Sequence, residues 1–241
     1  MNIMQNHFTM RLAGFVVAVD TVSPRTCILC RDYLCDADPD FSISVTEDDV
    51  RKEYIDSGCI RNNEINLETL AAYRKIVEKA LEYDTILMHG AVISVGDYSY
   101  MFTAPSGTGK TTHIKQWLKN VEGSFVVNGD KPLIRIQKDR IIACGTPWSG
   151  NEHLNRNTME RLKSIVIMER SEYNAIERIP FPEAYPYLLQ QTHKPRDPEK
   201  AKKVLTLLTD MYGLVSFWRF RCNNFKEDCF KVAYNALINQ N

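Results

Sequence analysis

APSGTGKTT, residues Ala104 to Thr112, matches the pattern G-x-x-x-x-G-K-[ST] except at its first position, where Ala104 replaces glycine. An apolar run typical of a β-strand, Tyr98 to Thr103, comes directly before it, and a helical pattern, Thr111 to Leu118, follows. A strand, a glycine-rich turn and a helix in this order favour a phosphate-binding loop over a simple reversal of the chain. The sequence therefore predicts a Walker A loop that binds a nucleoside triphosphate.

Each residue type in this loop has a physical reason. Gly107 and Gly109 can adopt backbone angles that other residues avoid, so that successive N–H groups point inward at phosphate oxygens. Lys110 places a positive charge beside the β- and γ-phosphates, and Thr111 offers a hydroxyl to Mg²⁺. ATP and Mg²⁺ are the predicted ligands. The predicted nucleotide-binding residues are Ser106, Gly107, Thr108, Gly109, Lys110, Thr111 and Thr112.

Phosphoryl transfer also requires a carboxylate that holds the metal ion or accepts a proton. Asp130 follows the predicted strand Phe125 to Val127, and strand ends beside such a loop are where ligands bind in open α/β sheets. A plain turn at Gly129-Asp130 is the alternative. His89 lies in another apolar strand, where a histidine is either a core residue or a member of the site.

The segment Gly145 to His153 is a second unusual loop, because it contains two glycines, a proline and a tryptophan. Such a loop is either a close backbone approach to a ligand or a structured turn, and loops carry binding residues more often than cores do. We expect a substrate loop here. Its candidate residues are Trp148, Ser149, Gly150, Glu152 and His153.

Composition excludes several classes of partner. The 241 residues are 44% hydrophobic, and 30 basic residues balance 30 acidic ones, so no net field favours nucleic acid or an anionic membrane. No apolar run approaches the roughly 20 residues of a membrane-spanning helix. The polar start lacks the pattern of a signal peptide, and seven scattered cysteines fit reduced thiols. We expect a cytoplasmic protein without nucleic-acid or membrane partners.

The rest of the chain indicates an α/β protein. Residues 81–241 alternate strands and helices and predict a P-loop domain with a mixed sheet, preceded by a small α+β segment, residues 1–80. In that segment, strands are expected at Leu12 to Val19, Thr26 to Tyr33 and Phe41 to Val45. Thr46 and Asp49 resemble a capping box that begins a helix.

Three stretches, taken in order, resemble motifs of the HPr kinase/phosphorylase and phosphoenolpyruvate carboxykinase superfamily. They are Met88 to Val92, the loop Ala104 to Thr112, and Val127 to Pro132. The resemblance implies a P-loop domain of that type, and an ATP-dependent kinase that phosphorylates a serine- or threonine-type hydroxyl of a protein, a peptide or a small molecule. It also implies catalytic roles for Asp130, His89 and Lys110, metal contacts for Thr111 and Asp130, and a homo-oligomer as one quaternary state.

One departure from the family motif is informative. The acidic motif of that family usually has two adjacent aspartates, whereas this chain has Gly129-Asp130. The departure keeps a second interpretation open, a non-catalytic ATP-binding partner or maturation factor. A carboxykinase-like enzyme is a third. The basic run between Lys194 and Lys203 is interpreted as a solvated helix face, with a docking patch for an acidic segment as the alternative.

Overall fold

The computed structural model describes residues 6–57, 64–223 and 228–239. The chain forms two compact units, Met1–Tyr83 and Asp84–Asn241, and each contains its own β-sheet. Both units mix helices with strands, so the protein is a mixed α/β protein. Within the described ranges, every helix is too short or too polar to cross a membrane.

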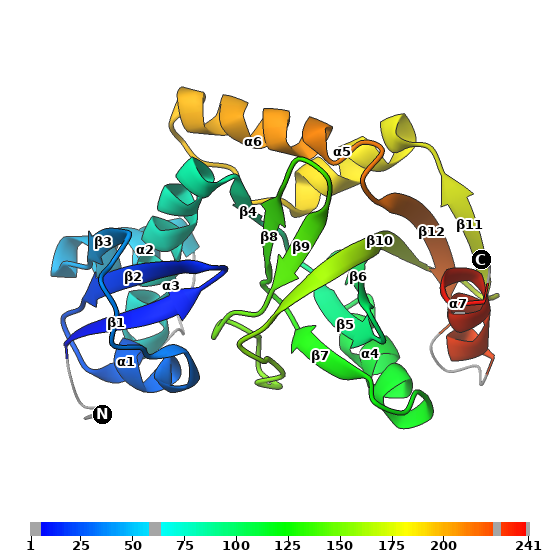
Figure 1. Ribbon diagram of the computed structural model, residues 1–241, viewed down its shortest axis with the longest axis horizontal. Helices are drawn as coiled ribbons and strands as arrows, with labels where there is room; N and C mark the ends of the chain where they lie inside the picture. Colours follow the sequence, from blue (N-terminus) through cyan, green and yellow to red (C-terminus); the bar gives the residue numbers. More distant parts are fainter. Residues whose placement is uncertain (1–5, 58–63, 224–227, 240–241) are drawn as a thin grey trace. The chain divides into compact units, whose positions relative to one another are not determined.

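The first unit has a three-stranded sheet in the order β1-β2-β3 (Figure 1). Strand β1 pairs antiparallel with β2, and β2 pairs parallel with β3. The predicted cap at Thr46 is confirmed, because its N–H and Oγ1 donate to Asp49 Oδ2 at 2.9 and 2.8 Å where α2 begins. The elements are β1 His7–Leu12, β2 Phe15–Asp20, α1 Arg25–Leu29, η1 Arg31–Tyr33, β3 Phe41–Ser44, α2 Glu47–Ser57, α3 Glu64–Ala80 and η2 Leu81–Tyr83.

The prediction of a strand over Thr26 to Tyr33 is wrong. This stretch forms the short helix α1 and the 3₁₀ turn η1. Thr26, Cys27 and Cys30 are fully buried. Their spacing of one and three residues places them on one face of a helix, whereas a strand would alternate them between two faces. The stretch is apolar, as predicted, but its buried residues are spaced as in a helix.

The second unit is built on a sheet of nine described strands, in which β10 is the branch point. Along one edge β10 pairs in parallel with β6. Along the other edge it pairs with β9 through its first residues and with β12 through its later ones. The strands are β4 Thr85–Leu87, β5 Ala91–Val95, β6 Tyr98–Thr103, β7 Phe125–Asn128, β8 Leu133–Ile136, β9 Ile141–Cys144, β10 Met159–Arg170, β11 Ala175–Ile179 and β12 Ser216–Cys222.

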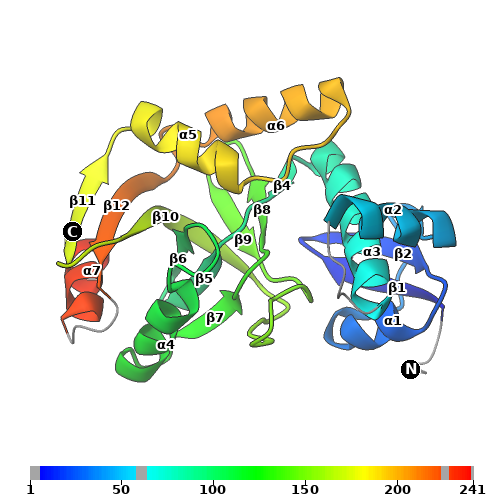
Figure 2. The same ribbon diagram turned by 180° about the vertical axis from the view of Figure 1, so that it is seen from behind.

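Helices α4 and α7 cover one face of this sheet, and Figure 2 shows α4 beside β5, β6 and β7. Alternate residues of the strands, such as Tyr100 and Phe102 of β6, point into the core under them. Trp117 of α4 is fully buried there, and its ring stacks on Tyr100 with the centroids 6.1 Å apart. The helices of this unit are α4 Lys110–Asn120, α5 Phe181–Gln191, α6 Pro198–Asp210 and α7 Cys229–Leu237.

His113 makes this core sensitive to acid. Its ring is fully buried and its Nε2 accepts a hydrogen bond from Trp117 Nε1 at 3.0 Å. Burial lowers the pKa of His113 to about 3, from 6.5. Below pH 6.5 the unfolded chain binds a proton that the folded one rejects, so this contribution to stability is complete above pH 6.5 and is lost as the pH falls.

We predict that the unfolding free energy falls by about 2 kcal/mol between pH 7.5 and pH 5.0 because of His113 alone. Urea titrations at the two pH values measure it. In His113→Gln, which carries no titrating ring, the drop should shrink by that amount, although the variant is less stable at both pH values. An equal drop in both proteins would contradict the assignment.

Candidate functional site

The topology brings four chain segments to one edge of the large sheet. β6 and β10 run parallel, so Thr103 and Arg170, at their carboxyl ends, lie at the same edge. β5 runs antiparallel to both β6 and β7, which places the residues before β5 and those after β7 at this edge too. The register pairs Ala91 with Phe102, and Val92 with Asn128. His89, Ala104, Asp130 and Arg170 are therefore neighbours in space although they are far apart in the sequence.

The loop between β6 and α4, residues Ala104–Gly109, is called the glycine loop below. Gly107 and Gly109 have φ angles of 78° and 109°, in the left-handed region that favours glycine. Gly109 is the N-cap of α4, and among the described residues no side chain makes a capping hydrogen bond to this helix. The first N–H groups of α4 lack helical acceptors at this end, and together with the helix dipole they favour an anion.

Lys110 is the first residue of α4, and it is 8% exposed. Its Nζ donates to the carbonyl oxygens of Ala104 and Pro105 at 2.8 and 3.3 Å, so the ammonium group lies inside the curve of the glycine loop. Burial lowers the pKa of Lys110, and the negative charge of Asp130 partly opposes this shift. A cation is thus held against a loop of backbone dipoles, close enough to a carboxylate to interact with it.

Asp130 is the centre of a polar network. Its Oδ1 lies 3.2 Å from His89 Nε2, and its Oδ2 lies 2.6 Å from Lys131 Nζ. Burial alone would raise the pKa of Asp130, but the hydrogen bonds and charges of His89 and Lys131 outweigh it and hold the pKa below its usual range. His89 Nδ1 lies 2.9 Å from Gln191 Oε1, at the end of α5. The carboxylate is therefore ionised and oriented at physiological pH.

Asn128 fixes the backbone on which Asp130 sits. Its buried Oδ1 accepts the N–H groups of Asp130 and Lys131 at 2.8 and 2.7 Å. Its Nδ2 donates to the carbonyl and the hydroxyl of Thr146, which ties the turn to the loop Gly145 to His153. The side chain thus holds the Asp130 turn and the predicted substrate loop together.

The predicted substrate loop reaches Asp130 through Gly150. A Cβ built on Gly150 would lie 3.2 Å from Asp130 Cβ. Trp148 and Ser149 are buried, whereas Gly150 to His153 are exposed. Glu152 is paired with Lys115 Nζ of α4 at 2.8 Å, and His153 has a positive φ of 50°.

Gly145 is needed for packing of this loop. A Cβ there would lie 1.8 Å from the carbonyl oxygen of Arg156 and 2.7 Å from that of Val127. We predict that Gly145→Ala lowers the unfolding free energy by about 3 kcal/mol, because backbone atoms must move apart. Gly213→Ala is the matched control: its φ is 81° and its Cβ meets nothing within 4 Å, so strain of about 1 kcal/mol is expected. Urea unfolding compares them, and equal losses would argue against crowding at Gly145.

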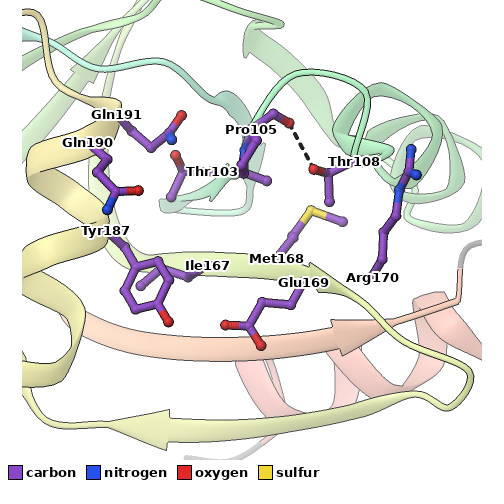
Figure 3. Close-up of a pocket in the computed structure, with 11 residues that line it drawn as sticks. Thr103, Pro105, Thr108, Ile167, Met168, Glu169, Arg170, Tyr187, Gln190 and Gln191 are labelled. Atoms are coloured by element: carbon purple, nitrogen blue, oxygen red, sulfur yellow. Dashed lines mark hydrogen bonds between the residues drawn. The ribbon is translucent and has the colours of Figure 1, made fainter.

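A cavity of about 300 Å³ opens beside the glycine loop, on the β10 side (Figure 3). Figure 3 shows three walls: the glycine loop with Thr103, the end of β10, and the last turns of α5. Gln191 belongs to this lining and also contacts His89, so the cavity is adjacent to the Asp130 network. The lining residues are Thr103, Ala104, Pro105, Thr108, Ile167, Met168, Glu169, Arg170, Tyr187, Gln190 and Gln191.

Arg170 was not expected at the site, yet its Nη2 donates to the carbonyl oxygen of Gly107. Gln191 was not expected either. Both stand at ends of secondary-structure elements, without any local motif. Only the pairing of β10 with β6 and of residues 87–89 with 191–193 places them here.

The residues present fit a magnesium ion. Mg²⁺ prefers hard oxygen ligands, and it is usually held by one or two carboxylates together with substrate phosphates. Asp130 offers an ionised carboxylate, and Thr111, a half-buried residue with a hydroxyl group, follows Lys110 in the first turn of α4. Within the described ranges no group of three or more His, Cys, Asp or Glu side chains gathers in a way that could hold a metal without a substrate.

Comparisons with known proteins find matches among solved structures. No family model matches the sequence, and no curated protein sequence matches it. Among solved structures, the Hpr(Ser) kinase/phosphatase from Coxiella burnetii is similar, with 8% sequence identity and a TM-score of 0.37. The match covers 62% of this chain and 89% of that one. These values do not show membership of a family.

Proposed function

We propose that the protein is an ATP-dependent phosphotransferase that moves the γ-phosphoryl group to a hydroxyl acceptor. One observation carries the proposal: Lys110, enclosed by the glycine loop, lies within electrostatic reach of the ionised Asp130 at the edge of the sheet. A cation beside a ring of backbone N–H groups suits the phosphates of the donor, and the carboxylate suits the acceptor and a metal ion. The sequence motifs that resemble HPr kinases fall on these residues.

The residues of the chain act mainly by position and charge. The glycine loop and the first turn of α4 hold the phosphates. Lys110 neutralises the negative charge that develops on the leaving oxygen. Asp130 orients the acceptor hydroxyl in line with the bond that breaks. The acceptor oxygen bonds to the γ-phosphorus, the bond to the β–γ bridging oxygen breaks, and the hydroxyl proton passes to Asp130 and then to solvent.

The lowered pKa of Asp130 makes it a weak base. This suits a loose transition state, in which the proton leaves only when the new bond is nearly formed. Mg²⁺, when bound by Asp130 and Thr111, would supply positive charge to the phosphate oxygens. His89 keeps the carboxylate in place and links it to Gln191.

The test is release of ADP and transfer of label from γ-labelled ATP with Mg²⁺, in the presence of mixed peptides and of small hydroxyl compounds. The proposal expects labelled product that depends on the acceptor. Tight ATP binding without label in any acceptor would contradict the proposed transfer reaction and favour a nucleotide-binding protein without transferase activity.

A second candidate function, a non-catalytic ATP-binding partner or maturation factor, rests on Gly129. The resemblance places the first aspartate of the acidic motif at this position. A Cβ on Gly129 would lie 3.2 Å from the carbonyl oxygen of Ser149 and 3.4 Å from that of Leu154. The loop after β9 thus crowds the space where a second carboxylate would begin, and the lack of that carboxylate favours nucleotide binding without transfer.

A further inference from the structure

A second cavity, of about 810 Å³, lies away from the glycine loop, at the other end of β6. Tyr98, the first residue of β6, lines it, together with the early residues of β10 and the turns before α5 and before β12. We call it the basic groove. Its apolar lining, called the floor below, includes Leu162, Phe181 and Phe217. The ring of Phe181 contacts those of Phe217 and Tyr212, both at 5.5 Å between centroids.

Three cations line the basic groove: Arg161 and Lys163 of β10, and Arg178 of β11. Arg161 and Lys163 both lie over the ring of Tyr98, 5.5 and 5.2 Å from its centroid. No aspartate or glutamate lines the groove, and within residues 6–57, 64–223 and 228–239 no carboxylate pairs with any of the three. The groove therefore combines uncompensated positive charge with an aromatic and apolar floor.

We propose that the basic groove binds an acidic segment of the peptide acceptor, with glutamate or aspartate side chains on the three cations and an apolar side chain on the floor. This inference rests on the proposed function and names the acceptor class. A volume near the upper end of the range for ligand pockets suits several side chains of an extended peptide. Nucleic acid fits less well, because three cations form no continuous stripe and the chain as a whole carries no net positive charge.

The groove and the glycine loop lie at opposite ends of the same elements. Helix α5 begins with Phe181 at the groove and ends with Gln191 at the cavity beside the glycine loop. Its 11 residues span about 16 Å at 1.5 Å per residue. An extended peptide covers about 3.3 Å per residue, so the acidic segment would lie about five residues from the hydroxyl that is phosphorylated.

Fluorescence anisotropy with a labelled peptide rich in glutamate around one phenylalanine tests the binding. The same peptide with lysine for each glutamate, and an oligouridylate, are the comparison probes. We expect the acidic peptide to bind most tightly, and Lys163→Glu combined with Arg178→Glu to weaken it about tenfold or more. Lys138→Glu, an exposed lysine in the turn between β8 and β9, should leave the affinity unchanged.

Equal affinity in the double variant, no binding by the wild type, or tighter binding of the oligouridylate would each overturn the proposal. ATP binding, measured by calorimetry on the same proteins, should be the same in wild type and double variant, which also shows that the variant is folded. If the acidic peptide binds but no peptide is phosphorylated, the groove is a peptide-binding site and the proposed kinase function is wrong. If wild type and double variant phosphorylate the peptide equally well, the kinase function holds and the proposed role of the groove is wrong.

Discussion

Lys110→Ala should lower the rate of phosphoryl transfer by about a hundredfold or more, because the Lys110 ammonium group is the cation that donates to the Ala104 and Pro105 carbonyls of the glycine loop. The Nζ group occupies the space bounded by the carbonyl oxygens of Ala104 and Pro105, and burial has already removed much of its hydration. Triphosphate oxygens would replace those carbonyls at a small cost. Calorimetry with ATP and Mg²⁺ and the γ-label assay measure binding and transfer separately.

Lys119→Ala is the matched control for this experiment. Lys119 lies in the last turn of the same helix and is exposed, so its removal changes helix charge but not the glycine loop. We expect its ATP affinity and transfer rate to stay within about twofold of wild type, because an exposed charge contributes little. If Lys110→Ala bound and used ATP as well as Lys119→Ala, the glycine loop would not be the donor site.

The sequence predicts local structure well where one period dominates. The strand Tyr98 to Thr103 and the helix after the glycine loop are confirmed, because alternation and helical spacing are clear there. Strand β11 was missed, since it is an exposed edge strand with Glu177 and Arg178 in its centre and only Ile179 buried. Edge strands carry such charges to avoid pairing with other chains, which removes the apolar signal.

The site was predictable only in part, for a similar reason. Lys110, Asp130 and His89 each stand in a recognisable motif, and the sheet brings them together. The partners Arg170 and Gln191 carry no motif of their own, since their positions follow from strand order and from the return of the chain after α5. Contacts between residues so far apart in the sequence depend on the packing of the whole sheet, and no local sequence pattern predicts that packing.

Asp130→Asn is expected to separate the two candidate functions. The amide keeps the shape of the side chain but removes its charge, so we expect the transfer rate to fall about a hundredfold or more while ATP affinity changes within about threefold. Steady-state kinetics with γ-labelled ATP give the rate, and calorimetry gives the affinity. Asp139→Asn, an exposed aspartate in the turn between β8 and β9, is the control and should behave as wild type.

The pH dependence sharpens this experiment. Because His89 and Lys131 hold the pKa of Asp130 below its usual range, the folded protein keeps this carboxylate ionised wherever a free aspartate begins to bind protons, near pH 4. The interactions of ionised Asp130 with His89 and Lys131 contribute fully to the unfolding free energy above that pH. This contribution is lost only as the pH falls further. Transfer should therefore show no loss between pH 7 and pH 5 from Asp130. A transfer rate in Asp130→Asn equal to wild type, at either pH, would show that another group acts on the acceptor and would contradict the role proposed for Asp130.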